Sequence, residues 1–204
     1  MTSSVDNMPS APDDYQLLLP EGWFRLSLEP EKRERSVGAL LDRQLKGIDN
    51  AAHFRRDLRQ ELMRRAADAY RGGGIELYLS MQQAGSLTIP ASLLVTLLPS
   101  PPSGGQLPQA AELAADLSAK AKGKRHISVV DLAAGKAVRI REEIESLPGE
   151  DDYALPSVTL EHRLCIPGTD AQLLLTFSTP LIQIADAMCE LFDAIAGSLT
   201  WKAG

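Results

Sequence analysis

Hydrophobic and polar positions change their spacing several times in the first part of the chain. Residues 23–28 alternate, which predicts a strand. Apolar residues then recur every three to four positions over 30–48 and over 51–70, as expected for two amphipathic helices that each bury one side. The glycines at 72–74 are expected to end the second helix. Its predicted inner stripe consists of Phe54, Leu58, Leu62, Ala66 and Ala69.

The rest of the chain is dominated by strands joined by short turns, which favours a mostly antiparallel sheet. Strands are predicted over 75–81, 87–98, 127–131, 137–144, 158–166 and 173–177, and a helix over 109–121. Thr179 is expected to cap a last helix, with Pro180 at its first position and an apolar face that runs to Leu199. This order predicts an α/β protein of the α+β type, in which helices pack on the sheet.

The chain is expected to form a single domain after a short leader. Residues 1–14 are rich in Ser, Asp, Asn and Pro and are expected to be disordered, without the basic and apolar regions of a signal peptide. Residues 15–204 form the domain, interrupted by a Pro- and Gly-rich loop at 99–108. No apolar run is long enough to span a bilayer. Cys165 and Cys189 lack metal-ligand spacing, and free thiols are favoured over the alternative of one disulfide between them, so a cytoplasmic location is expected.

One short motif resembles a known family. The run Leu19-Pro20-Glu21-Gly22-Trp23 is similar to the opening of the PsbP-like proteins, a group that includes the MOG-type Ran-binding factors. The close of the chain is compatible as well, because an apolar strand over 173–177 precedes a long C-terminal helix. The resemblance implies an α/β/α sandwich over about residues 15–201 and a non-enzymatic role in binding and assembly.

Charge is distributed unevenly along the chain. The 204 residues carry a net charge of −6, opposite in sign to that of a dedicated nucleic-acid binder. Residues 31–71 nevertheless contain 11 basic and 7 acidic side chains, so this segment has a local charge of +4 and the remainder has −10. Its arginines are expected to pair with Asp57, Glu61 and Asp68 or with an acidic rim, which consists of Glu142, Glu143, Glu145, Glu150, Asp151 and Asp152. This polarity favours contact with another protein, and nucleic-acid binding is not expected.

The candidate partner-binding surface is the second predicted helix. Its proposed contact residues are Arg55, Arg56, Arg59 and Arg64, together with Trp23, which is expected to lie exposed beside them. The alternative surface is acidic, because Asp186, Glu190 and Asp193 recur at i, i+4 and i+7 on the last helix. That acidic face is either a solvated outer side or a site for a basic partner.

No catalytic or metal-binding constellation stands out in the sequence. His162 is in phase with the apolar residues of its strand and is expected to be a buried histidine with one hydrogen-bond partner. There is no nucleophile-elbow pattern, and no metal or cofactor is expected. The leading hypothesis is a non-enzymatic adaptor, chaperone-like protein or assembly accessory factor that acts through protein contact.

Two alternative functions stay open at this point. One is a small-molecule binder or an unrecognised enzyme with a pocket between the sheet and the first helices, near Tyr78 and His162. The other is an immunity-type protein that neutralises a toxin, which a compact acidic fold fits equally well.

Overall fold

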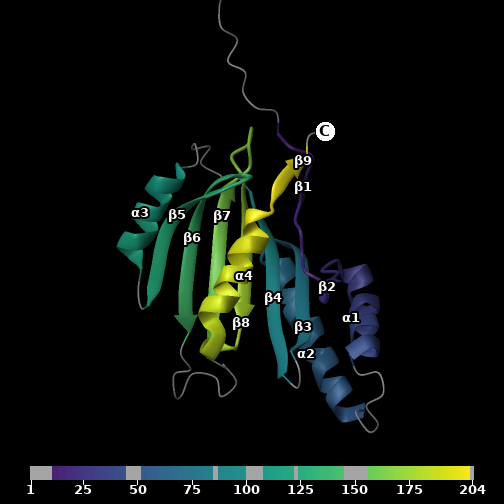
Figure 1. Ribbon diagram of the computed structural model, residues 1–204. Helices are drawn as coiled ribbons and strands as arrows, with labels where there is room; N and C mark the ends of the chain where they lie inside the picture. Colours follow the sequence, from purple (N-terminus) through teal and green to yellow (C-terminus); the bar gives the residue numbers. More distant parts are fainter. Residues whose placement is uncertain are drawn as a thin grey trace, which may run out of the picture.

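The computed structural model describes residues 11–44, 52–84, 87–99, 108–121, 124–144 and 156–202. Within these residues, seven strands form one antiparallel sheet in the order β2-β3-β4-β8-β7-β6-β5, so that β2 and β5 are its two edges (Figure 1). The strands are β2 (Trp23–Leu26), β3 (Gly74–Ala84), β4 (Leu87–Leu98), β5 (Arg125–Leu132), β6 (Gly135–Ile144), β7 (Ser157–Cys165) and β8 (Gln172–Thr179).

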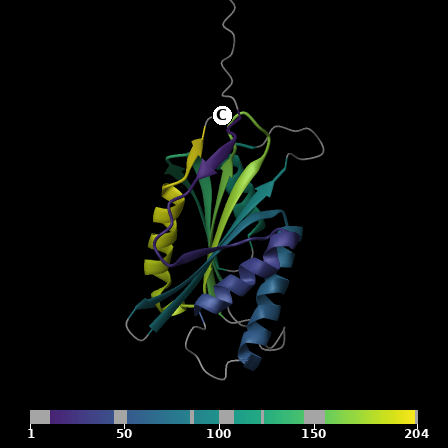
Figure 2. The same cartoon turned by 90° about the vertical axis from the view of Figure 1, so that its right-hand side faces the viewer.

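Helices cover both faces of the sheet. α4 (Ala185–Gly197) lies across one face, and α1 (Pro30–Gln44) and α2 (Ala52–Arg71) lie on the opposite side, as Figure 2 shows. α3 (Ala110–Lys120) contacts β5 and β6. The α+β class and the layering of helices on an antiparallel sheet, both predicted from the sequence, are therefore confirmed.

Each face of the sheet has its own hydrophobic core, because successive side chains of a strand point to opposite sides. On the α4 side, Phe177 of β8 stacks on Phe192 of α4 with ring centroids 4.9 Å apart, and both rings are fully buried. On the other side, Val37 and Leu41 of α1 pack with Ala66 of α2. The central strands therefore need apolar residues on both faces, which the sequence of β4 already indicates.

The turn from α2 into β3 depends on glycine. Gly73 has a φ of +84°, which L side chains rarely adopt. A Cβ on Gly74 would lie 2.7 Å from the carbonyl oxygen of Ala69, which is closer than real side chains come. The N–H of Gly72 donates to the carbonyl oxygen of Asp68 over 3.0 Å and closes the last turn of the helix. The helix stop predicted at these glycines is confirmed.

Two short strands were not predicted from the sequence. β1 (Asp14–Gln16) and β9 (Thr200–Lys202) pair with each other in a separate antiparallel sheet. The predicted leader at residues 1–14 is therefore wrong at its end, since Asp14 already belongs to a strand. Three residues are too few to show a period, so a strand of this length is visible only when its partner is placed beside it. Residues 1–10 lie outside the described residues.

The predicted start of the last helix is wrong. Thr179 is the final residue of β8, where it is fully buried and faces Val158 of β7. A 3-10 turn, η1 (Ile182–Ile184), comes before α4 begins at Ala185. The Thr179 hydroxyl does cap locally, because it accepts the N–H of Leu181 over 3.2 Å, and it also donates to the carbonyl oxygen of Pro90 over 2.9 Å. Pairing with β7 thus overrides the local capping pattern.

The inner stripe predicted for α2 is wrong at Phe54. This side chain is 59% exposed, whereas Ala66 on the same helix is fully buried. Figure 1 shows the reason, since the first turns of α2 extend past the end of the neighbouring strands. Periodicity marks the side of a helix that faces inward, but it does not show how far the underlying sheet reaches. The predicted first helix also extends to 48, and its part beyond Gln44 lies outside the described residues.

Replacing Phe177 by Ala is expected to lower the free energy of unfolding by about 3–5 kcal/mol, because the change removes a buried ring and leaves a cavity beneath α4. Phe54→Ala is the matched control on the exposed end of α2 and is expected to change the same quantity by less than about 0.5 kcal/mol. Urea unfolding followed by circular dichroism measures both. Losses of equal size would contradict this placement of the core.

Candidate functional site

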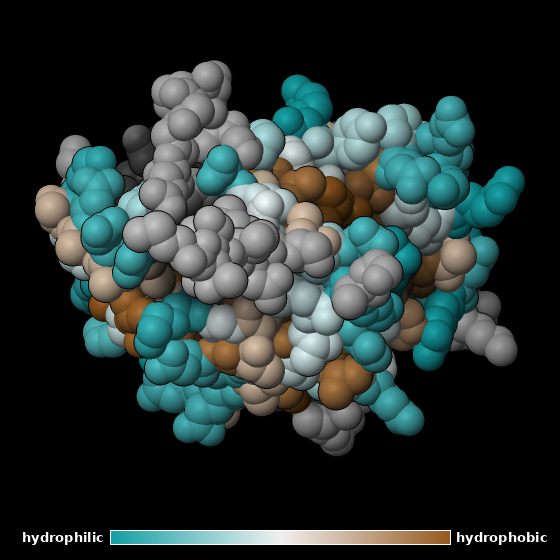
Figure 3. Space-filling view, turned by 90° about the horizontal axis from the view of Figure 1, so that it is seen from above, coloured by the Kyte–Doolittle hydropathy of each residue, from teal (hydrophilic) through white to brown (hydrophobic). Residues whose placement is uncertain are grey.

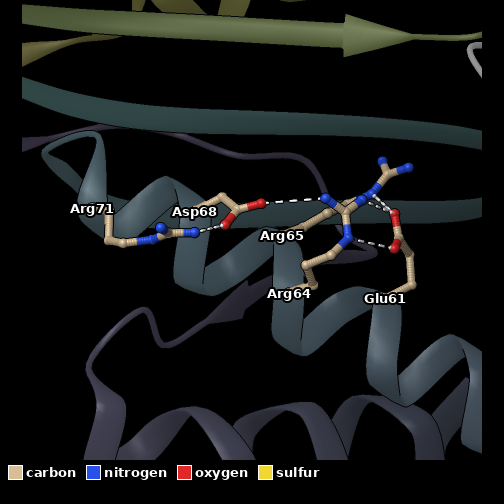
Figure 4. Close-up of polar contacts among 5 residues, drawn as sticks. All are labelled: Glu61, Arg64, Arg65, Asp68 and Arg71. Atoms are coloured by element: carbon tan, nitrogen blue, oxygen red, sulfur yellow. Dashed lines mark hydrogen bonds and ion pairs between the residues drawn. The ribbon is translucent and has the colours of Figure 1, made fainter. Parts of the chain in front are cut away.

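The second half of α2 carries a row of arginines held by two carboxylates (Figure 4). Glu61 accepts hydrogen bonds from Arg64 at 2.8 and 3.0 Å and from Nε of Arg65 at 2.5 Å. Asp68 accepts from Nη1 of Arg64 at 3.3 Å and also from Arg71. In each bonded pair the arginine and the carboxylate are three or four positions apart, which places them side by side on the helix surface. Arg64 bridges the two carboxylates, so the row is continuous.

The same contacts change the acidity of the groups involved. The hydrogen bonds from Arg64 and Arg65 lower the pKa of Glu61 to about 2, and the bond to Glu61 raises the pKa of Arg64. Both groups are therefore fully charged near neutral pH. Exposed ion pairs of this kind contribute little to folding because water and salt screen them. Their main effect is to fix the positions of the guanidinium groups.

Two further arginines connect α2 to α1. Arg55 pairs with Asp42, and Arg59 pairs with Glu34, so both arginines turn toward the neighbouring helix. The pairing predicted with Glu61 and Asp68 is confirmed for the second half of α2. For the first half, the carboxylates come from α1 instead, because the antiparallel packing of the two helices brings them within reach. Of the acidic rim, Glu142 pairs with Arg125 and Glu143 with Arg141, and its other members lie outside the described residues.

Arg56 differs from its neighbours on α2. It is exposed, and no carboxylate among the described residues lies within ion-pair distance of it. Of the four arginines proposed from the sequence, Arg55, Arg59 and Arg64 are thus paired within the chain and Arg56 is open. We call the arginines that α2 presents the α2 arginine surface; its members are Arg55, Arg56, Arg59, Arg64, Arg65 and Arg71.

Trp23 does not lie exposed beside these arginines, as the sequence interpretation expected. It is partly buried and packs against the core on the α4 side, and its buried indole N–H has no hydrogen-bond partner within the described ranges. The alternation of β2 explains this, because Phe24 and Leu26 face α1 and α2 and therefore turn Trp23 to the opposite face. Trp23 and the α2 arginine surface lie on different sides of the sheet.

The acidic side of α4 is not the free surface that its spacing indicated. Asp186 pairs with Arg141 over 2.6 Å, and Asp193 binds Arg139 through two hydrogen bonds of 2.8 Å. Both arginines belong to β6, so they reach the helix from the sheet. Glu190 is exposed and has no ion-pair partner among the described residues. Two of the three carboxylates thus hold α4 to the sheet, and the helical pattern alone does not reveal this.

Asp193 also binds the buried histidine. His162 is fully buried, and its Nε2 lies 2.9 Å from Oδ1 of Asp193, while its Nδ1 has no hydrogen-bond partner in the described part of the chain. The prediction of a core histidine with one partner is confirmed. Burial raises the pKa of Asp193, but the hydrogen bonds from His162 and Arg139 outweigh it and lower the pKa to about 2. The carboxylate therefore stays ionised at the boundary between β7 and α4.

The pocket considered between the sheet and the first helices is not where the sequence interpretation placed it. Tyr78 and His162 both point to the α4 face, away from α1 and α2. The cavity that does lie beside α2 has a volume of about 440 Å³ and is open to solvent. Its lining includes Leu62, Arg65, Met81, Ser92 and Ser178. These side chains form a shallow groove without a convergent set of catalytic groups.

Three further features of the described residues concern metal ligands, membrane-spanning helices and thiols. No group of three possible metal ligands occurs among them. In the same residues, no helix combines the length and apolar character needed to cross a membrane. Cys165 and Cys189 are both free, as predicted, and burial raises the pKa of each thiol. Seen from above, hydrophilic side chains surround several smaller hydrophobic areas (Figure 3).

Comparisons with known proteins find a likeness in fold. No family model matches the sequence, and no curated protein is similar enough to count as a relative. LpqN of Mycobacterium tuberculosis, described as involved in cell envelope biogenesis, is 11% identical with a TM-score of 0.49, over 95% of this chain and 86% of that one. The Ran-binding protein Mog1p of Saccharomyces cerevisiae is 12% identical with a TM-score of 0.45, over 93% and 90%.

A third solved structure, CyanoP (PsbP) of Synechocystis sp. PCC 6803, is 14% identical with a TM-score of 0.30, over 98% of this chain and 90% of that one. The resemblance to PsbP-like and MOG-type proteins stated from the sequence is thus found again by comparison of structures. At these identities, it is a likeness of architecture.

Asp193→Asn is expected to lower the free energy of unfolding at neutral pH by about 1–3 kcal/mol, because it weakens the only hydrogen bond of His162 among the described residues and removes the charge opposite Arg139. The folded pKa of about 2 lies below the ordinary value of 3.8. The carboxylate therefore stabilises the fold fully above pH ~4, and this contribution is lost as the pH falls toward 2. The difference between wild type and variant should narrow over that interval.

Urea unfolding at a series of pH values measures this difference. Glu61→Gln is the control, because Glu61 also has a pKa lowered to about 2 but lies on an exposed helix surface. Its effect should be small and should weaken further in added salt. If the free energies of unfolding of the wild type and Asp193→Asn differ by the same amount down to pH 2, the assigned role of the carboxylate is contradicted.

Proposed function

We propose that the protein is a non-enzymatic, cytoplasmic accessory factor that binds an acidic protein partner through the α2 arginine surface. The observation that carries the proposal is the arrangement of that surface. Carboxylates at 61 and 68 hold Arg64, Arg65 and Arg71 in place, while Arg56 is exposed without an ion-pair partner among the described residues. The fold neighbours do not enter the argument, because their similarity is too low to transfer a function.

A fixed arginine row has a physical advantage for binding. Long charged side chains lose conformational freedom when a partner orders them, and this loss weakens the complex. Arg64 is already ordered by Glu61 and Asp68, so less freedom remains to be lost. A planar guanidinium also offers five N–H donors. Arg64 uses three of them toward Glu61 and Asp68, so two remain for a carboxylate of the partner. An acidic segment of a partner fits this pattern of donors.

Arg56 is the residue through which the proposal can be tested with least effect on folding. Arg59→Glu would place a carboxylate beside Glu34 and disturb the contact between α1 and α2. Arg56 makes no such contact with the described residues of α1, so reversing its charge changes the surface and leaves the ion pairs between the two helices in place. Lys120 on α3 offers the same change of charge on a different helix; its side chain is 71% exposed, and its ion pair with Asp116 lies within α3, so the change stays local to that helix.

Arg56→Glu is expected to weaken binding of the partner by roughly threefold to tenfold, mainly through a slower association rate and with a loss of salt sensitivity. The partner is first obtained by affinity purification from the native host with quantitative mass spectrometry, and its purified form is then measured by surface plasmon resonance. Lys120→Glu should bind like the wild type. Unchanged affinity and salt dependence for Arg56→Glu would refute the assignment of this surface.

A further inference from the structure

β5 is a long strand with one open edge. Its eight residues, Arg125–Leu132, pair with β6 without a shift in register, and β6 is its only neighbour in the part of the chain that the structure describes. α3 contacts β5 and β6 as well, and Val129 of β5 remains 38% exposed. The outer backbone groups of β5 pair with no other strand among the described residues, and α3 lies on the face that carries Val129.

β5 lacks most of the features by which proteins usually protect such an edge. It contains no proline and no bulge, and its middle residues Ile127 to Val130 are uncharged. β2, the opposite edge of the same sheet, has only four residues. Short edges, prolines, bulges, central lysines and a helix or loop over the edge limit pairing with another chain. α3 contacts β5 on the face that carries Val129, so it flanks the strand. A regular eight-residue edge without prolines, bulges or central lysines is suited to strand addition.

We propose that two copies of this chain associate through their β5 strands, antiparallel to each other, with Ser128 of one copy opposite Ser128 of the other. A two-fold axis perpendicular to the sheet would then pass between these two serines. This arrangement pairs Arg125 with the partner's Asp131 and Ile127 with the partner's Val129, and each pair occurs twice because the interface is symmetric. The two sheets would join into one continuous sheet.

Charge complementarity at both ends of β5 supports this register. Within the chain, Arg125 lies opposite Glu142 of β6, and Asp131 lies opposite Lys136. In the proposed dimer, charges along one row therefore alternate from negative to positive across four strands, from Glu142 through Arg125 and the partner's Asp131 to the partner's Lys136. The Asp131 side chain is 81% exposed in the single chain, so it is free to meet a second cation.

The apolar positions form a matching row on the same face. Ile127 lies opposite Ile140, and Val129 lies opposite Val138, both of which are buried. Joining the two copies in this register places Ile127 beside the partner's Val129, so that four strands contribute β-branched side chains to one continuous strip. Such cross-strand pairs are favourable in antiparallel sheets. The partly exposed Val129 would thereby become covered.

Neighbouring registers are less favourable. In an antiparallel pair, residues that lie directly opposite each other have their side chains on the same face of the sheet. The register can therefore change only when one strand shifts by two residues relative to the other. A step in one direction places Asp131 opposite the partner's Ile127. A step in the other places Arg125 opposite the partner's Val129. Both alternatives separate the charged pairs, so the register centred on Ser128 is the one that the sequence favours.

Charge reversal provides the principal test. Arg125→Asp and Asp131→Arg should each weaken self-association by about tenfold, because each places like charges opposite each other at both ends of the interface. A mixture of the two variants should associate again, since the Asp at 125 of one then faces the Arg at 131 of the other. Sedimentation velocity over a concentration series into the high micromolar range measures all four samples, because an edge contact of this size makes a weak dimer.

Cross-linking tests the register independently of the charges. In a Cys165→Ser background, Ser128→Cys should form an intermolecular disulfide under mild oxidation, since the two positions face each other across the axis. Val130→Cys is the matched control on the same face of β5. In this register it lies opposite the partner's His126, so it should form little or none of the cross-linked product.

The outcomes separate the proposal from its rivals. Restored association in the mixture together with a cross-link at 128 supports the β5 dimer. A wild type that stays monomeric at all concentrations, or variants whose mixture associates no better than each alone, would overturn it. A cross-link at 130 that equals the one at 128 would overturn the register. Circular dichroism melting of each variant shows whether it is folded, and the cross-linking result decides the question if a charge variant is not.

Discussion

The sheet packs against helices on both of its faces, and the need to bury apolar side chains on both faces determines most of the structure. Successive side chains of each strand point alternately toward α4 and toward the opposite helical layer. The position of a residue along its strand therefore determines which layer it contacts. Phe177 and Leu175 of β8 meet the α4 side, and their neighbours meet the other. A polar residue that falls on a buried position then needs its own partner. His162 occupies such a position, and Asp193 of α4 supplies the partner.

The local pattern of hydrophobic and polar residues predicts most of the helices and strands, but it does not predict which face of a strand is buried. β4 was predicted with the observed bounds, and α2 within one residue, because period and turn residues are properties of neighbouring positions. β1 and β9 were missed, since each is too short to show a period and forms only beside its partner. Trp23 was placed in the wrong layer for a related reason. Alternation separates two faces, but only the packed helices determine which of them is buried.

The candidate site shows the same division between sequence and structure. The count of charges in residues 31–71 is correct, yet it describes neither which arginines are paired nor with which residues. Arg64 could be assigned to Glu61 from its spacing, because that contact lies within one helix. The contact of Arg59 with Glu34 could not, because it depends on how α1 packs against α2. Arg56 becomes distinctive only after its neighbours have been assigned their partners.

Binding of a partner and association with a second copy use different parts of the molecule. α2 contacts β3, near one edge of the sheet, whereas β5 forms the other edge and is separated from β3 by four strands. The groups involved also differ, since α2 offers charged side chains and β5 offers backbone donors and acceptors. Binding at either surface therefore leaves the groups of the other surface free. A dimer through β5 would therefore carry two α2 arginine surfaces related by the two-fold axis, and a partner with two acidic segments could gain affinity by contacting both.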